Sequence, residues 1–150
     1  MIELQRILVA TDFSEHSDNA VRYAAEFAKV FGSELHLLHV AERVPIMYGE
    51  GGAVTPEIES EAITRAQGML NDLLADSVNL KVERSVVPGH PFVEICRYAK
   101  DHDIDLIVIG THGRGAFAHL LMGSVAERVV RKAKCPVMTV REGEHEFVMP

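Results

Sequence analysis

Short apolar runs rich in β-branched residues alternate along this chain with longer segments of helical periodicity, and this alternation limits the possible folds most strongly. Strands that alternate with helices indicate an α/β fold with a parallel sheet and right-handed crossovers. The first and fourth runs are apolar almost throughout, as interior strands covered on both faces should be. The five expected strands are Arg6–Ala10, Glu34–Val40, Leu80–Val87, Asp105–Ile109 and Val137–Val140.

Four helices are expected between the strands, and residues typical of helix ends mark most of them. The first starts from Ser14, and Gly32 stands where a glycine commonly ends a helix in the left-handed conformation. The second opens with Thr55 as N-cap and proline in its first turn. A turn at Pro88–Pro91 leads into the third, and the fourth begins at Ser124. The second helix should bury an apolar stripe of Ile58, Ala62, Ile63, Ala66, Met69, Leu70 and Leu73.

Length, charge and cysteine content limit the classes of function. The 150 residues predict a single domain, 1–150, with 141–150 as a frayed tail. The net charge of −7 argues against non-specific nucleic-acid binding, although a helix terminus can still hold one phosphate. No apolar run approaches the roughly 20 residues of a membrane-spanning helix. Cys96 and Cys135 match no metal or redox spacing and, without a signal peptide, predict buried, reduced thiols in a cytoplasmic protein.

Two of the expected strands end in residues suited to binding a ligand. The first is followed by Thr11-Asp12-Phe13-Ser14, and the fourth by a glycine-rich segment that runs from Gly110 to Gly123. In open α/β sheets, ligands bind beyond the carboxyl ends of the strands, where the strand order reverses. If these two strands are neighbours, both segments face one crevice. The long loop Ala41–Val54, which has three glycines and no periodicity, is another frequent place for function.

The glycine-rich segment is typical of a phosphate site. Gly110 and Gly113 allow close approach of the backbone, and Gly123-Ser124 starts a helix whose free N–H groups and dipole favour an anion. Arg114 offers a forked cation to phosphate oxygens. The glycine-rich segment is neither a P-loop, because the P-loop lysine is absent, nor a dinucleotide-binding fingerprint. For Ser124 alone, an N-cap role in a capping box with Glu127 is the stronger interpretation.

The polar residues near these strand ends leave several roles open. Asp12 can accept hydrogen bonds from ribose hydroxyls or an adenine amino group, or it can order the turn before the first helix. His112 holds the glycine loop or, less simply, takes part in catalysis. His36 and His39 lie three apart on one strand and therefore face opposite sides, so they make no metal pair. A phospho-acceptor receiver domain is disfavoured because the first strand ends in a single Asp.

These residues resemble the universal stress protein family, specifically its ATP-binding branch. The family pattern is Gly, two residues, Gly, nine residues and Gly-Ser/Thr, which Gly110, Gly113 and Gly123-Ser124 match. The likeness also covers ILVATDFSEHSDNAVRYA, LHLLHV, DLIVIGTHGRG and GSVAERVVRKAKCPVMTV. The resemblance implies a three-layer αβα sandwich, Rossmann-like and similar to the adenine nucleotide alpha-hydrolase fold. Its five-stranded parallel sheet would have the order 3-2-1-4-5.

The resemblance also implies ATP in the crevice and a homodimer. Magnesium would bridge the phosphates with few or no protein ligands. The dimer would pair the edge strand Val137–Arg141 of two chains, unless Arg141, Glu142 and the tail protect that edge. Thr11, Asp12 and Val40 would contact adenosine, while the ribose and phosphates would meet Gly110, Gly113, Arg114, Gly123, Ser124 and Val125.

Three functions follow from this reading. The first is an ATP-binding regulatory or protective module of the cellular stress response. The second is a slow ATPase or phosphotransferase in which Arg114 and His112 stabilise the transferred charge. The third is a nucleotide-free dimeric scaffold. The sequence shows no general base near the γ-phosphate, so fast hydrolysis is not expected and no catalytic residue is assigned.

Overall fold

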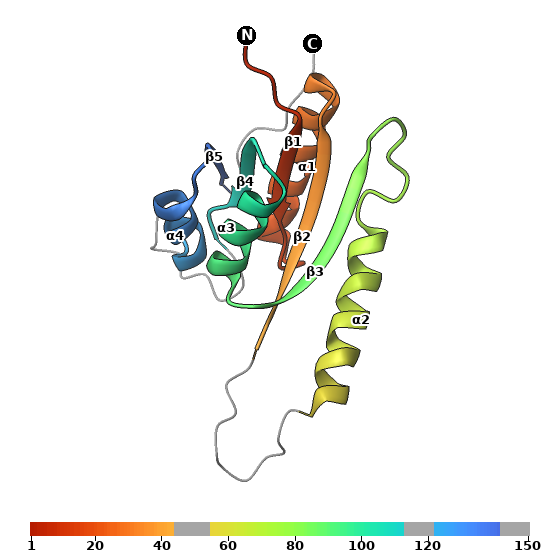
Figure 1. The fold of residues 1–150 in the computed structure, drawn as a ribbon. Helices are drawn as coiled ribbons and strands as arrows, with labels where there is room; N and C mark the ends of the chain where they lie inside the picture. The colour runs from red at the N-terminus through yellow and green to blue at the C-terminus, as the bar shows by residue number, and fades with distance from the viewer. Residues whose placement is uncertain (44–54, 113–121, 142–150) are drawn as a thin grey trace.

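A five-stranded parallel sheet forms the centre of the computed structural model, which describes residues 1–43, 55–112 and 122–141 (Figure 1). The strand order is β3-β2-β1-β4-β5, which confirms the predicted order 3-2-1-4-5. The strands are β1 (Arg6–Ala10), β2 (Glu34–Glu42), β3 (Val82–Gly89), β4 (Leu106–Gly110) and β5 (Val137–Val140).

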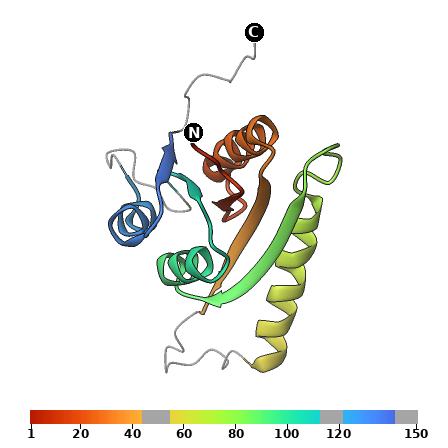
Figure 2. The same cartoon turned by 45° about the horizontal axis from the view of Figure 1, so that its top comes forward.

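Helices cover both faces of the sheet and make three layers. α1 packs on β1, β2 and β4, and α2 packs on β3 and β2. Figure 2 shows α3 and α4 on the opposite face, where they contact each other. The predicted αβα sandwich is therefore confirmed. The helices are α1 (Glu15–Phe31), α2 (Pro56–Asp72), α3 (Pro91–Asp101) and α4 (Ser124–Lys132).

The interior strands supply two cores because successive side chains point to opposite faces. On β1, Ile7 and Val9 join the core under α1, whereas Leu8 joins the core under α3 and α4. All three side chains are fully buried. β4 behaves in the same way, with Val108 on the first side and Ile107 on the second. This two-sided burial explains why both runs are apolar almost throughout.

The second and third strands are shifted or extended relative to the prediction. The expected turn at Pro88–Pro91 is shorter than predicted, because β2 and β3 stay paired in register as far as Glu42 and Gly89. Gly89 has a φ of 145°, a conformation that side-chain-bearing residues rarely adopt, and it lets the chain leave β3 for α3. Loop residues 44–54 lie outside the described part of the chain.

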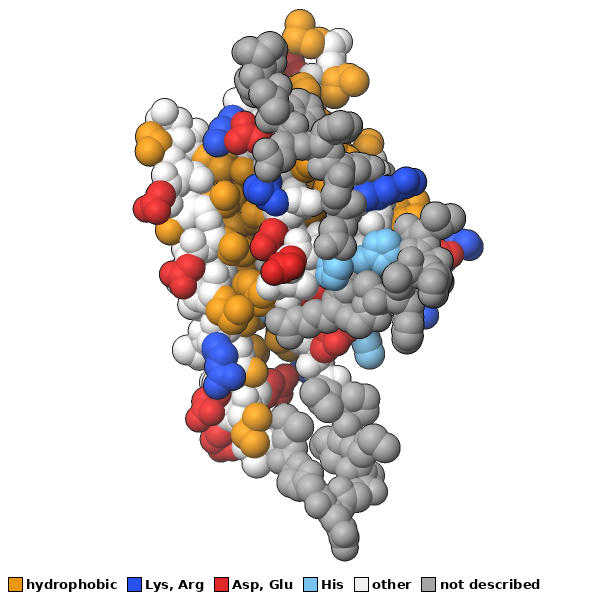
Figure 3. All heavy atoms as spheres, turned by 180° about the vertical axis from the view of Figure 1, so that it is seen from behind, with side chains coloured by type: hydrophobic (Ala, Val, Ile, Leu, Met, Phe, Trp, Pro, Cys, Tyr) orange, Lys and Arg blue, Asp and Glu red, His pale blue; other side chains and the backbone are white. Residues whose placement is uncertain are grey.

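The apolar stripe predicted along α2 is only partly buried. Ala66 and Leu70 are in the interior, but Ile58 and Met69 are 54% and 42% exposed. The reason is position: α2 lies over β3 and β2 at one edge of the sheet, where the layer ends. The face shown in Figure 3 carries a continuous band of apolar side chains. Within the three described segments, no helix is long and apolar enough to cross a membrane.

Candidate functional site

The strands β1 and β4 are neighbours, so their carboxyl ends lie side by side. Val9 on β1 pairs with Val108 on β4, and each strand continues for one or two residues beyond that pair. β1 is also the strand at which the order reverses, because β2 lies on its other side. The predicted crevice is therefore where an open α/β sheet binds its ligands. We call this side of the sheet the carboxyl edge.

The β1–α1 loop, residues 11–14, is held by its own hydrogen bonds. The Ser17 hydroxyl donates to the Ser14 carbonyl at 2.9 Å, so in the 3.0 Å bond between the Thr11 and Ser17 hydroxyls Thr11 is the donor. The Thr11 Oγ1 also accepts from the Phe13 N–H at 3.0 Å. The Asp12 Oδ1 accepts from the Ser14 N–H at 3.0 Å and from its hydroxyl. The turn-ordering role considered for Asp12 is thus present, and its nucleotide role stays a prediction.

Thr11 uses all its polar groups inside the protein. Besides the hydroxyl bonds, its N–H donates to the Leu38 carbonyl at 2.9 Å, and its carbonyl accepts from the His39 Nδ1 at 2.8 Å. The side chain is 4% exposed. The contact predicted between Thr11 and adenosine is untested, and with these bonds in place it would be a packing contact.

His39 is a site residue that sequence reasoning missed. It lies on β2, and its ring packs on the Phe13 ring with centroids 4.5 Å apart. Strand alternation places His39 on the face opposite His36, which bonds to Tyr98, so the two histidines face opposite sides of the sheet as predicted. Only the folded sheet brings His39 to the β1–α1 loop, because 28 positions separate it from Thr11.

Gly110 is required by the close approach of α1. A Cβ added at Gly110 would lie 2.8 Å from the backbone oxygen of His16 in the first turn of that helix. This distance is shorter than real side chains tolerate, and a backbone atom cannot swing aside. Gly110 therefore has a packing role, in addition to the backbone approach to phosphate predicted for it.

The start of α4 differs from the capping box expected for Ser124. Gly123 is the N-cap, and its carbonyl accepts the first helical bond from the Glu127 N–H at 3.0 Å. Ser124 is the first helical residue, so it is not the capping residue, and Gly123 has no side chain with which to cap the helix. The Gly123 N–H donates to the Thr111 carbonyl, which holds the helix start beside the end of β4. The first turn thus presents N–H groups that the helix does not use, at its positive end.

The remaining predicted residues lie around this edge or outside the described segments. Val40 is buried near the end of β2, on the face under α3 and α4, and Val125 is partly buried in the same core. Gly113 and Arg114 fall in residues 113–121, which the structure does not describe. The structure thus brings β1, β2, β4 and α4 residues to one edge and leaves those two untested.

Imidazoles also gather at the carboxyl edge. His112 follows β4, and its Nδ1 lies 3.0 Å from the hydroxyl of the adjacent Thr111. Its predicted role in holding the glycine loop stays a prediction. Its ring centroid is 6.5 Å from that of His16 in α1. In the described portion of the chain, no group of three or more His, Cys, Asp or Glu side chains is arranged to hold a metal ion.

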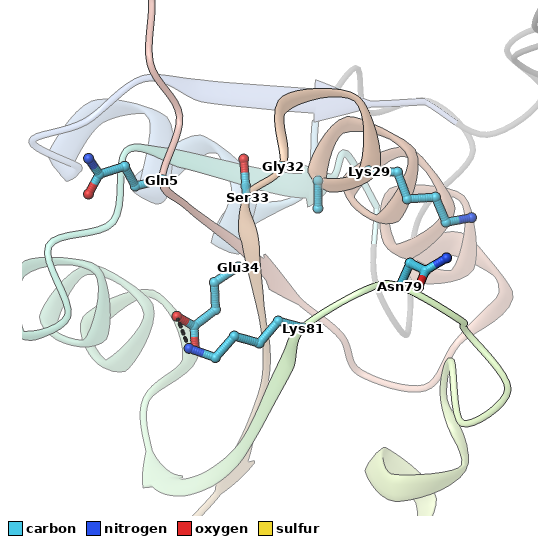
Figure 4. A pocket seen from close by; sticks show the side chains of 8 residues that line it. Gln5, Lys29, Gly32, Ser33, Glu34, Asn79 and Lys81 are labelled. Atoms are coloured by element: carbon cyan, nitrogen blue, oxygen red, sulfur yellow. Dashed lines mark hydrogen bonds and ion pairs between the residues drawn. The ribbon is translucent and has the colours of Figure 1, made fainter.

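A depression of about 350 Å³ lies at the opposite, amino edge of the sheet (Figure 4). The Lys81 ammonium and the Glu34 carboxylate point toward each other and form an ion pair at 2.9 Å. Lys29 pairs with Glu26 at 2.8 Å, and the Ser33 hydroxyl bonds to the Leu4 carbonyl at 2.5 Å. The four charged or hydroxyl side chains of this depression are therefore engaged within the protein and do not converge on a ligand.

Sequence comparisons identify a family model and close relatives. A model described as the universal stress protein family matches residues 3–141. Universal stress protein MJ0531 of Methanocaldococcus jannaschii is 32% identical over 149 residues, which cover 95% of this chain and 85% of the relative.

Solved structures share the fold over nearly the whole chain. Protein MJ0577 of the same organism, at 29% identity, has a TM-score of 0.76 and covers 96% of this chain and 100% of its own. UspA from Lactobacillus plantarum, at 26% identity, has a TM-score of 0.77 with coverage of 94% and 100%.

Two more distant structures were solved with nucleotides and show likeness of fold alone. A universal stress protein in complex with cAMP is 24% identical, with a TM-score of 0.68 and coverage of 93% and 98%. The protein from Archaeoglobus fulgidus in complex with dAMP is also 24% identical, with a TM-score of 0.59 and the same coverage.

Proposed function

Because the chain belongs to the universal stress protein family, we propose that it is an ATP-binding regulatory or protective module of the stress response. One observation carries this proposal: the start of α4, whose N-cap is a glycine without a side chain, lies beside the end of β4, at the edge where the β1–α1 loop also lies. Unused N–H groups at a helix N-terminus favour a phosphate. The relatives solved with cAMP and dAMP support an adenine nucleotide as the ligand class.

The proposed site divides between adenosine and the phosphates. Asp12 accepts hydrogen bonds from the nucleoside, and Val40 and Thr11 provide packing contacts. The backbone N–H groups of Ser124 and Val125 receive the phosphates, because the N-cap leaves them unused. Gly113 and Arg114 are proposed to complete the phosphate side, together with Gly110 and Gly123. Magnesium is proposed to bridge phosphate oxygens, because the described residues gather no acidic cluster to hold it.

We further propose that residues 1–150 act as one unit in the cytoplasm. The family model covers residues 3–141 without interruption, which supports a single domain. The cysteines Cys96 and Cys135 are free and partly buried, and burial raises the pKa of both thiols. Unreactive, reduced thiols suit a reducing compartment.

The first test identifies the ligand directly. Freshly purified protein is denatured and the released small molecules are identified by mass spectrometry. The stripped protein is then titrated with ATP, ADP, AMP and GTP in the presence of magnesium, using calorimetry. Co-purified or micromolar adenine nucleotide supports the proposal. A folded protein that gives no heat of binding at millimolar ATP would exclude it and favour the scaffold.

Gly123→Val locates the phosphates within the site. Gly123 has φ −68° and ψ 158°, an extended conformation that valine adopts without strain, so the variant should fold. We expect ATP binding to fall by at least about tenfold, or roughly 1.4 kcal/mol, because the side chain occupies the phosphate path. Gly68→Val in α2 is the matched control, since a Cβ there meets nothing within 4 Å. Unchanged ATP affinity in folded Gly123→Val would show that the phosphates bind elsewhere.

A further inference from the structure

We propose that His39 is the positioning residue of the nucleoside half of the site and acts by fixing Asp12. This inference rests on the proposed nucleotide function and adds to it a residue on β2. The His39 Nδ1 donates to the Thr11 carbonyl at 2.8 Å, because a carbonyl oxygen can only accept. The same ring packs on Phe13 with a centroid separation of 4.5 Å and an interplanar angle of 35°. His39 thus contacts the residue before Asp12 and the residue after it.

The backbone around Asp12 needs such a support. Phe13 has a φ of 62°, in the left-handed region that favours glycine and is costly for an aromatic residue. A residue in this conformation persists only when its surroundings over-determine it. The Thr11 hydroxyl accepts from the Phe13 N–H, and the His39 ring holds the Phe13 side chain against the core under α1. Left-handed residues of this kind gather at ligand sites, where the strain keeps a loop pre-organised.

The two contacts also explain why a histidine suits this position. An aliphatic residue could pack against Phe13 but would leave the Thr11 carbonyl without its hydrogen-bond donor. An amide could donate to the Thr11 carbonyl but would offer little surface to the Phe13 ring. Imidazole supplies a donor at Nδ1 and a flat face in one side chain. The Asp12 carboxylate is then held in one orientation through the backbone on both of its sides.

The test separates the nucleoside from the phosphates. Wild type, His39→Phe and His39→Asn are each titrated with ATP and with inorganic tripolyphosphate. Phenylalanine keeps the packing and removes the donor, whereas asparagine places an amide nitrogen near the position of Nδ1. We expect His39→Phe to bind ATP about tenfold more weakly, the effect of one lost hydrogen bond or slightly more. We expect its tripolyphosphate affinity to be unchanged and His39→Asn to recover part of the loss for ATP.

A double-mutant cycle tests whether His39 acts through Asp12. Asp12→Asn is measured alone and combined with His39→Phe. If His39 works by orienting the Asp12 carboxylate, His39→Phe weakens ATP binding much less in the Asp12→Asn protein than in wild type. If His39 acted on stability alone, His39→Phe would lower the melting temperature and leave ATP affinity unchanged below that temperature, or it would weaken the binding of ATP and of tripolyphosphate equally.

Each outcome has one meaning. Selective loss of ATP affinity together with a non-additive cycle supports the positioning role. Wild-type protein that binds ATP while folded His39→Phe binds it equally well overturns the role of His39 and leaves the proposed function standing. Additive losses overturn the action through Asp12. Wild-type protein that binds no adenine nucleotide overturns the proposed function, and the inference falls with it.

Discussion

His36, on the face of β2 away from His39, belongs to a buried polar cluster that is separate from the candidate site. Its Nδ1 lies 2.9 Å from the Tyr98 hydroxyl, which is itself 3.3 Å from that of Ser85. His102 stacks on Tyr98 with centroids 3.8 Å apart. The His36 Nε2 is buried and has no hydrogen-bond partner among the described residues. Protonating the ring would therefore bury an N–H group with no acceptor.

Burial lowers the pKa of His36 below its ordinary value, although the Glu34 and Glu83 carboxylates oppose the shift. The unfolded chain then binds a proton more readily than the folded protein, so stability falls as pH drops below about 6.5. This loss of stability stops once the pH is below the lowered pKa of His36 in the folded protein. One such group changes the free energy of unfolding by at most about 1.4 kcal/mol per pH unit. We expect the free energy of unfolding, measured by urea denaturation at each pH, to vary less steeply with pH between 7.5 and 5 in His36→Gln than in wild type. Exposed His90→Gln is the control, and equal slopes in all three proteins would refute the prediction.

Gly110→Ala tests the packing role of this residue apart from any ligand. The added methyl would meet the His16 carbonyl at 2.8 Å, so α1 or β4 must shift. We expect a loss of roughly 1–3 kcal/mol in unfolding free energy, as for other overpacked sites, measured by urea denaturation. Gly68→Ala should instead gain about 0.5–1 kcal/mol, because it removes a glycine from a helix interior with open space around it. Equal stability of Gly110→Ala and wild type would show that the contact relaxes at no cost.

Individual residues also show how far sequence reasoning reaches. The glycines of the proposed site could be nominated because their spacing is local and follows a recognised pattern, and their binding role stays a prediction. The N-cap of α4 could not be, because Gly123 and Ser124 both suit that position and only the backbone decides between them. His39 was missed since its partners come from a loop that joins it only in the folded sheet.

At the scale of single elements, α1 ends as predicted, and its C-cap allows a test of backbone strain alone. Gly32 has a φ of 67°, and a Cβ there would meet nothing within 4 Å. Gly32→Ala should therefore destabilise the protein by about 1–2 kcal/mol, the cost of a left-handed L-residue, with no steric contribution. Gly32→Asn should lose less, because asparagine tolerates this conformation. Denaturation midpoints of the three proteins check the order, and an alanine variant as stable as wild type would contradict it.

Element ends and exposed faces were harder to predict than element types. Each predicted strand and helix is present, because hydrophobic periodicity is a strong local signal. β3 extends through Pro88 because its pairing with β2 continues, which a local turn signal cannot reveal. The stripe on α2 was overestimated since periodicity identifies an apolar face without showing whether a layer covers it.

For the whole molecule, the alternation of strands and helices was enough to predict a parallel α/β sheet, but not its strand order. That order came from family resemblance, and the structure and the relatives agree with it. The order matters for function because it makes β1 and β4 neighbours at the carboxyl edge. It also leaves β5 at one margin of the sheet, where a second chain can pair with it.

The hydrogen bonds of β5 show which of its groups face outward. The carbonyls of Pro136 and Val140 accept from the Ile107 and Thr111 N–H groups, at 3.0 and 2.9 Å. Alternate residues of a strand direct their backbone groups to opposite sides, so Thr139 directs its own N–H and C=O away from β4. Its side chain is exposed as well. The homodimer implied by the family resemblance would therefore use the Thr139 backbone, whereas the β4–β5 bonds would remain intact within each chain.

Thr139→Pro should separate the two chains without unfolding them. Proline removes the outward N–H and is tolerated at the open side of an edge strand. We expect sedimentation velocity to show dimers for wild type and monomers for the variant, with unchanged far-ultraviolet circular dichroism. Thr139→Val keeps the N–H and should remain dimeric, which separates the backbone effect from that of the side chain. A wild-type monomer at micromolar concentration would exclude the homodimer, and a dimeric, folded proline variant would move the interface away from β5.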